Sequence, residues 1–202
     1  MKVSAAILAG GAATRFGGRD KSALVVGRRT ILDRQLAMLE TVTDDVLIVG
    51  AGDGARFDAG RPFQGRRISD IVPGCGPLGG LHAALTAARG DAVFLLAGDM
   101  PSVTASFAAH LCSLAGDAEI VVPQTERGYH PLCAVYTRAC LGPVAARLAD
   151  RRLRMRELVD SLRARVVTAE DIARFGDPHQ LLANVNTPAE YAGLEALQGH
   201  KL

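Results

Sequence analysis

Residues 92–97 have the sequence AVFLLA, and this wholly apolar run constrains the fold more than any other stretch of the chain. Successive side chains of a β-strand point to opposite faces of a sheet, so a strand of this composition needs apolar cover on both sides. Parallel sheets flanked by helices provide that cover. The run therefore predicts a central strand of a parallel sheet.

Short apolar segments alternate with amphipathic segments along most of the chain. Strands are expected at 3–8, 46–49, 68–72, 92–97, 120–122, 133–136 and 166–167. Helices are expected at 30–41, 77–85, 107–114, 154–163 and 188–197. This order predicts a three-layer α/β fold, and the chain length fits one domain, residues 1–202. Ligands of such sheets bind beyond the carboxyl ends of the strands, so the loops at those ends are the places to look for chemistry.

Charge and composition exclude several classes of protein. The chain has 23 Lys and Arg against 21 Asp and Glu, a balance that disfavours a general nucleic-acid binder. The apolar stretch at residues 3–9 is too short for a signal peptide or a membrane span. The four cysteines lack the spacing of zinc ligands. We therefore expect a cytoplasmic monomer that acts on small molecules, without a membrane or nucleic-acid partner.

A glycine-rich loop, LAGGAATRFGGRDKSAL, follows the first expected strand. Its glycines let backbone amides approach a ligand closely, and Arg15 and Lys21 add positive charge. Lys21 is the only lysine away from the chain ends, in a chain that otherwise uses arginine. The loop is not a Walker A motif, because Asp20 precedes Lys21 where that motif has glycine. It nevertheless predicts a phosphate-binding site.

A second glycine loop offers a competing interpretation. Gly74, Gly76 and Gly79 match Gly-x-Gly-x-x-Gly, and Asp99 follows Gly79 at the spacing of a dinucleotide-binding fingerprint. An NAD-dependent dehydrogenase using the loop 74–79 is therefore an alternative. The motif does not follow the first strand, however, and it would leave the loop 8–24 without a purpose.

Asp99 itself ends the most apolar strand, in the sequence AGDMPSV. A carboxylate at this edge of the sheet could bind Mg²⁺ together with phosphate oxygens of a substrate. The alternative is a cap for the next helix, but Ser102 or Thr104 could serve as that cap. Arg15, Lys21 and Asp99 are therefore the candidate catalytic residues.

The ordered set of motifs resembles the molybdenum cofactor guanylyltransferases, bacterial enzymes that join the GMP part of GTP to molybdopterin. The motifs are LAGG from residue 8, R-x-GG-x-DK from 15, PG-x-GPL-x-GL from 73, GDMP from 98, HPL from 130 and NVNTP from 184. The resemblance implies a Rossmann-like nucleotidyltransferase fold, with a mostly parallel sheet and one reversed strand. It also implies Mg²⁺ as cofactor, GTP and molybdopterin as substrates, pyrophosphate as a product, and cofactor delivery or insertion proteins as partners.

The resemblance also assigns site residues at matching positions. The GTP site would comprise Leu8, Ala9, Gly10, Gly11, Gly18, Lys21 and Asp70; Arg15, Gly18 and Lys21 would contact phosphates; Asp99 would bind Mg²⁺; and Asn184 and Asn186 would lie on the pterin side. One departure is Gly50, where the family commonly has Asn after the second strand. A cytidylyltransferase acting on the same pterin is an alternative, although that enzyme has LAAG where this chain has LAGG.

Three further points stay open at the level of sequence. His130 is either a loop histidine with a satisfied ring or a substrate contact. The seven arginines between residues 147 and 165 are either the solvated face of a helix or a surface that attracts the pterin or a protein carrying it. A family member that binds and delivers the pterin without catalysis is the non-enzymatic alternative.

Overall fold

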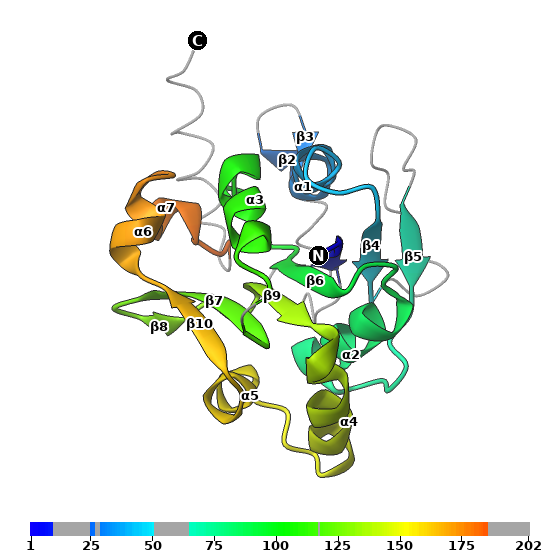
Figure 1. The fold of residues 1–202 in the computed structure, drawn as a ribbon. Helices are drawn as coiled ribbons and strands as arrows, with labels where there is room; N and C mark the ends of the chain where they lie inside the picture. The colour runs from blue at the N-terminus through cyan, green and yellow to red at the C-terminus, as the bar shows by residue number, and fades with distance from the viewer. Residues whose placement is uncertain (10–24, 27–28, 51–64, 117, 186–202) are drawn as a thin grey trace.

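A computed structural model describes residues 1–9, 25–26, 29–50, 65–116 and 118–185 of the chain (Figure 1). Its main sheet has eight strands: β1 (Val3–Leu8), β4 (Val46–Val49), β5 (Arg66–Ile68), β6 (Ala92–Ala97), β7 (Ile120–Thr125), β8 (Gly128–Tyr129), β9 (Cys133–Thr137) and β10 (Ala164–Val167). Their order is β10-β7-β9-β6-β1-β4-β5, and β8 pairs with β7. A separate pair is formed by β2 (Val25–Val26) and β3 (Arg29–Thr30).

Strand β6 lies at the centre of this sheet, as its apolar sequence predicts. All six of its residues are buried, between β1 on one side and β9 on the other. It runs parallel to β1 but antiparallel to β9. Strand β9 is also antiparallel to β7, whereas β10 is parallel to β7. The sheet is therefore mostly parallel with β9 reversed, which confirms the expected fold class.

Helices cover both faces of the sheet and complete the three layers. They are α1 (Ile31–Leu39), α2 (Gly76–Ala87), α3 (Ala105–Ser113), α4 (Leu141–Ala149), α5 (Met155–Ser161), α6 (Ala169–Ala173) and α7 (Pro178–Leu181), with a 3₁₀ turn η3 (Arg138–Cys140) before α4. In Figure 1, α1 and α3 lie above the sheet and α2, α4 and α5 lie below it. Within the described residues, no helix is both long and apolar enough to cross a membrane.

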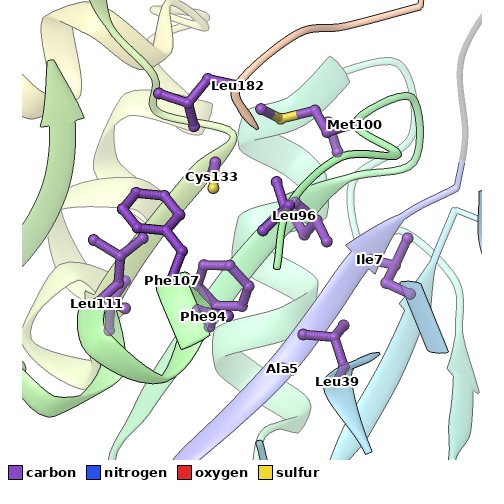
Figure 2. Packing of buried hydrophobic residues seen from close by; sticks show 14 of the residues in the cluster. Ala5, Ile7, Leu39, Phe94, Leu96, Met100, Phe107, Leu111, Cys133 and Leu182 are labelled. Carbon is purple, nitrogen blue, oxygen red and sulfur yellow. The ribbon is translucent and has the colours of Figure 1, made fainter. Parts of the chain in front are cut away.

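Each face of the sheet has its own hydrophobic core. Figure 2 shows part of the core beneath α1 and α3, where Phe94 of β6 packs with Phe107 and Leu111 of α3. The opposite core joins Leu95 of the same strand to α2, α4 and α5. Adjacent residues of β6 thus serve opposite cores, which explains why no position in this strand is polar.

One expected strand lies elsewhere in the structure, and one helix was not expected. The strand expected at 68–72 lies earlier, at Arg66–Ile68, and Ile71 is 52% exposed. Arg66 can begin this edge strand because its guanidinium binds the Asp45 carboxylate at 2.7 Å. Helix α4 has no counterpart among the expected elements, and it contains Gly142 and Pro143. They occupy its first turn, where proline is tolerated. The helix expected at 188–197 lies outside the described residues.

Candidate functional site

The candidate site lies where the parallel strands β1, β4, β5 and β6 end together. Leu8 is the last residue of β1, and Ala9 follows it, buried, with its amide bonded to Val49 of β4. Asp99 lies two residues after β6, and Asp70 lies two residues after β5. The fold therefore places two carboxyl groups in loops at the edge of the sheet where ligands of open α/β folds bind.

The turn that carries Asp99 joins three segments that are distant in sequence. The Gly98 amide donates to the Leu8 carbonyl at 3.0 Å, and the Ala97 amide donates to the Leu132 carbonyl at 2.8 Å. The Val185 amide donates to the Asp99 carbonyl at 2.8 Å. The end of the first strand, the HPL motif and the NVN motif thus meet around this one turn.

A side chain that the sequence did not single out also reaches this turn. Gln35, in α1, is buried, and its Nε2 donates to the Ala97 carbonyl at 2.8 Å and to the Met100 carbonyl at 3.1 Å. The position of Gln35 in the helical pattern of α1 does not mark it as a site residue. Its contact with Ala97, 62 positions further along the chain, is what distinguishes it.

The next helix does not use Asp99 as its cap. Thr104 precedes α3, and its hydroxyl accepts from the Phe107 amide at 3.4 Å. The Asp99 carboxyl group is therefore not consumed by helix capping. Carboxylate oxygen is a donor that Mg²⁺ prefers, and Mg²⁺ commonly completes its shell with waters and substrate phosphates. The described residues contain no group of three or more His, Cys, Asp or Glu that could hold a metal.

Asp70 begins the loop that leads to α2. Partial burial raises the pKa of its carboxyl group. A cation or a hydrogen-bond donor nearby would favour the ionised form of this group and oppose that shift. Further along, Gly74 and Gly76 have φ angles of +73° and +56°, which side chains rarely adopt. The loop follows β5, a strand at the edge of the sheet, which is not where a dinucleotide fingerprint normally begins.

Close packing accounts for another glycine near this loop. A Cβ atom at Gly80 would lie 2.6 Å from Cδ2 of Leu8. Helix α2 therefore lies directly against the end of β1. Glycine at this position brings the helix and the strand together at the candidate site, whatever ligand is bound.

Gly50 has a structural explanation of its own. Its φ angle is +87°, and its amide donates to the Ile68 carbonyl at 3.1 Å. Glycine adopts this conformation freely, and Asn is among the few other residues that tolerate it. The backbone here suits both the glycine of this chain and the asparagine common in the family.

His130 lies between β8 and β9, in the motif that reaches the Asp99 turn. Its Nε2 is 2.9 Å from the Thr125 hydroxyl, so one ring nitrogen has a protein partner. Burial lowers the pKa of His130, and the nearby charge of Arg127 lowers it further, while Glu126 opposes the shift. The ring is therefore neutral at neutral pH. The bond to Thr125 fits a structural role for His130. The segment that carries this ring also borders the candidate site, which fits a contact with substrate.

The arginine-rich segment does not form one uniform solvated face. Arg147 is buried, and its Nη2 binds the Glu157 carboxylate at 2.7 Å, joining α4 to α5. Arg154 is 85% exposed and lies 3.5 Å from the same carboxylate. Arg147 is thus part of the packing between helices, and the interpretation as a solvated face is wrong for this residue.

The structure describes only some of the remaining predicted site residues. Asn184 is described: it is exposed and precedes the buried Val185. The predicted residues Gly10, Gly11, Arg15, Gly18, Lys21 and Asn186 lie outside the described part of the chain. Of the predicted set, the structure brings Leu8, Ala9, Asp99 and Asn184 to one place.

Comparison with known proteins gives matches over most of the chain. The family model described as the MobA-like NTP transferase domain matches residues 5–183. The molybdenum cofactor guanylyltransferase of Desulfosudis oleivorans is 31% identical over 201 residues, covering 96% of this chain and 95% of the relative.

Solved structures, among them the following two, share the fold. Molybdopterin-guanine dinucleotide biosynthesis protein A from Archaeoglobus fulgidus has a TM-score of 0.81 at 22% identity, covering 99% of this chain and 100% of that one. The 2-C-methyl-D-erythritol 4-phosphate cytidylyltransferase from Thermus thermophilus has a TM-score of 0.73 at 20% identity, covering 98% of each chain. At these identities the likeness shows the fold alone.

Proposed function

Because the chain belongs to the MobA-like NTP transferase family, it is a nucleotidyltransferase, and we propose that it transfers GMP from GTP to the terminal phosphate of molybdopterin. The proposed product is the guanine dinucleotide form of the molybdenum cofactor. The name of the 31% identical relative supports this choice of substrates, as does the LAGG sequence at residues 8–11.

One structural observation carries the proposal. The Asp99 turn bonds to Leu8, where the predicted GTP loop begins, and to Val185, within the motif assigned to the pterin. A transfer between two phosphorylated substrates requires both to meet at one place. The hydrogen bonds of this turn support such a meeting point next to the Asp99 carboxyl group.

The reaction needs positioning and charge stabilisation more than acid–base chemistry. A phosphate oxygen of the pterin attacks the α-phosphorus of GTP, a new O–P bond forms, and the bond to the β-phosphate oxygen breaks to release pyrophosphate. The attacking phosphate is already ionised, so no side chain has to remove a proton. This agrees with a site in which His130 is a neutral residue bound to Thr125 rather than a nucleophile or a base.

Each proposed residue has a defined task. Arg15 offers a planar fork of donors to phosphate oxygens, and Lys21 supplies a mobile point charge. Asp99 holds the divalent cation. When bound, Mg²⁺ supplies a Lewis acid that neutralises phosphate charge. The amide side chains of Asn184 and Asn186 orient the pterin. Leu8, Ala9, Gly10, Gly11, Gly18 and Asp70 complete the GTP site.

The proposal extends to the organisation of the protein. We propose that residues 1–202 form one nucleotidyltransferase domain, because the two cores lie on opposite faces of a single sheet. Proteins that deliver or insert the finished cofactor are its proposed partners.

Thermal unfolding with different nucleotides tests the choice of substrate. We expect GTP with Mg²⁺ to raise Tm, since a ligand at about 100 times its Kd stabilises a protein by about 2.7 kcal/mol, a shift of several degrees for a chain of this size. CTP, ATP and NAD should raise Tm much less. Selective stabilisation by CTP would favour the cytidylyl alternative, and selective stabilisation by NAD would favour the dehydrogenase.

Turnover separates an enzyme from a pterin carrier. The purified protein with GTP, Mg²⁺ and molybdopterin should release pyrophosphate, and omission of any one component should stop the release. A protein that binds molybdopterin but releases no pyrophosphate would support the carrier.

A further inference from the structure

We propose that Gln35 is a positioning residue that holds the Asp99 turn in the geometry needed to bind the divalent cation; this inference rests on the proposed function. Its Nε2 donates to the Ala97 carbonyl at 2.8 Å and to the Met100 carbonyl at 3.1 Å. Ala97 precedes Gly98 and Met100 follows Asp99, so one amide group binds the backbone on both sides of the turn.

The surroundings of Gln35 show that packing alone does not call for an amide. Its neighbours Leu32, Leu36 and Leu39 in α1 are buried in the core beneath this helix, and Gln35 is itself only 2% exposed. Its Oε1 has no hydrogen-bond partner among the described residues. A buried polar atom left unpaired costs about 1–3 kcal/mol. An apolar residue at this position would avoid that cost but could not donate to the turn, as Nε2 does.

Gln35 attaches the turn to an element that the backbone hydrogen bonds do not reach. The backbone bonds of the turn to Leu8, Leu132 and Val185 attach it to the sheet edge and to the neighbouring loops. Gln35 attaches it to a helix. Helix α1 is also the first helix after the glycine loop 8–24 in the sequence. The Gln35 amide therefore connects the chain segment that follows the proposed phosphate loop with the turn that carries the proposed metal ligand.

The Met100 side chain completes this arrangement. Figure 2 shows Met100 at one end of the core, near Leu96 and Leu182, and it is 2% exposed. With its side chain fixed in the core and its carbonyl held by Gln35, the backbone after Asp99 has little freedom to move. Displacing a catalytic group by about 1 Å can cost about 100-fold in rate, so a side chain that restricts this turn acts on the chemistry through Asp99.

The substitution Gln35→Met tests the proposal, because it keeps a side chain of similar length and removes the donor. The probe is Mn²⁺ in the presence of saturating GTP and without pterin, with free Mn²⁺ measured by electron paramagnetic resonance on the full-length protein. We expect the Kd for Mn²⁺ to rise about tenfold, a loss near the 1.4 kcal/mol of a hydrogen bond. The Kd for GTP in EDTA should change less than about twofold, and raising Mn²⁺ should restore turnover.

Thr43→Val is the matched control. The Thr43 hydroxyl donates to the Val3 carbonyl at 2.6 Å, at the opposite end of β1, so its loss also removes a hydrogen bond from a side chain to the backbone. The two variants should lose comparable thermal stability, but Thr43→Val should bind Mn²⁺ as the wild type does. If Gln35→Met does not fold, Gln35→Asn, which keeps the amide and shortens its reach by one methylene, replaces it.

A second measurement does not depend on any substrate. The Gly98 amide donates from the turn to the Leu8 carbonyl, and the Val185 amide donates to the turn at Asp99. Hydrogen exchange of both amides should be faster in Gln35→Met than in the wild type and unchanged in Thr43→Val. Unchanged Mn²⁺ affinity and unchanged exchange in Gln35→Met would overturn the role of Gln35 alone. A wild-type protein that binds neither GTP nor Mn²⁺ would contradict the proposed function, and the role of Gln35 with it, even if exchange at the turn responded.

Discussion

The position of Asp99 depends on backbone atoms, whereas its proposed chemistry depends on its carboxylate. Asp99→Ala keeps the hydrogen bonds of Gly98 and Val185 and removes the oxygens. We therefore expect turnover to fall by about 100- to 1000-fold, as when a group stabilising charge in a transition state is removed. Pyrophosphate release measures the activity, and circular dichroism melting measures the fold. Near-normal activity in a folded Asp99→Ala protein would remove the metal assignment.

Arg151 provides a test of backbone strain. Its φ angle is +56°, at the end of α4, where the Arg151 amide donates to Leu148 and the Arg152 amide donates to Arg147. This is the Schellman pattern, in which the left-handed position is usually glycine. Arg151→Gly relieves about 1–2 kcal/mol of strain and loses about 0.5–1 kcal/mol to the added freedom of the unfolded chain. We therefore expect it to stabilise the protein by up to about 1.5 kcal/mol.

Urea unfolding measures this change, with Arg152→Gly as the control. Arg152 has no left-handed conformation to relieve, so its replacement by glycine should destabilise the protein. A loss of stability in Arg151→Gly would indicate that the contact of its Nη1 with the Cys75 sulfur at 3.6 Å outweighs the strain.

At the scale of elements, the sequence predicted those strands and helices whose apolar pattern is visible in the local sequence alone. The strands at 3–8, 46–49 and 92–97 were located from apolar runs alone. The location of β5 depends instead on the ion pair of Arg66 with Asp45, a contact between residues that the sequence does not relate. Element boundaries fixed by tertiary contacts of this kind are not visible in local periodicity.

Asp45 binds three distant segments of the chain and predicts how stability depends on pH. Its carboxylate accepts from the Ser4 hydroxyl at 2.6 Å, from Arg66 at 2.7 Å and from the Arg89 amide at 2.9 Å. Burial alone would raise the pKa of Asp45, but these donors together outweigh burial and lower it. A lowered pKa contributes stability at neutral pH that is lost as the pH falls below about 4, through the pKa of the folded state.

Asp45→Asn should therefore reduce the free energy of unfolding at neutral pH by about 1–3 kcal/mol, with a smaller deficit in acid. Urea unfolding across this pH range measures both values. The exposed neighbour Asp44 serves as the control, because Asp44→Asn also removes one carboxylate but keeps the hydrogen bonds of Asp45. Equal deficits for Asp45→Asn at neutral and acidic pH would contradict the assignment of the shift to this carboxylate.

At the scale of the whole molecule, the site depends on contacts between distant parts of the chain. The sequence gives reasons to place Asp99 at the sheet edge, since it ends a central strand. The family resemblance was needed to place Asn184 in the same site, because no period or spacing relates it to Asp99. The hydrogen bond from Val185 to Asp99 supplies the physical connection between them. The Gln35 contact could not be predicted at all, because a single sequence does not relate a helical residue to carbonyls so far along the chain.

The connection at Val185 can be separated from the burial of its side chain. Val185 is fully buried, so Val185→Ala removes apolar contacts but keeps the amide, whereas Val185→Pro also removes the donor to Asp99. Both variants should lose about 1–3 kcal/mol of stability. Only Val185→Pro should weaken molybdopterin binding, by about tenfold, because only this variant removes the hydrogen bond between the NVN motif and the Asp99 turn. Equilibrium binding of molybdopterin alongside urea unfolding makes the comparison. Equal pterin affinity in the two variants would mean that the NVN motif reaches the pterin without this hydrogen bond. Packing in the core alone would then hold the NVN motif beside the Asp99 turn.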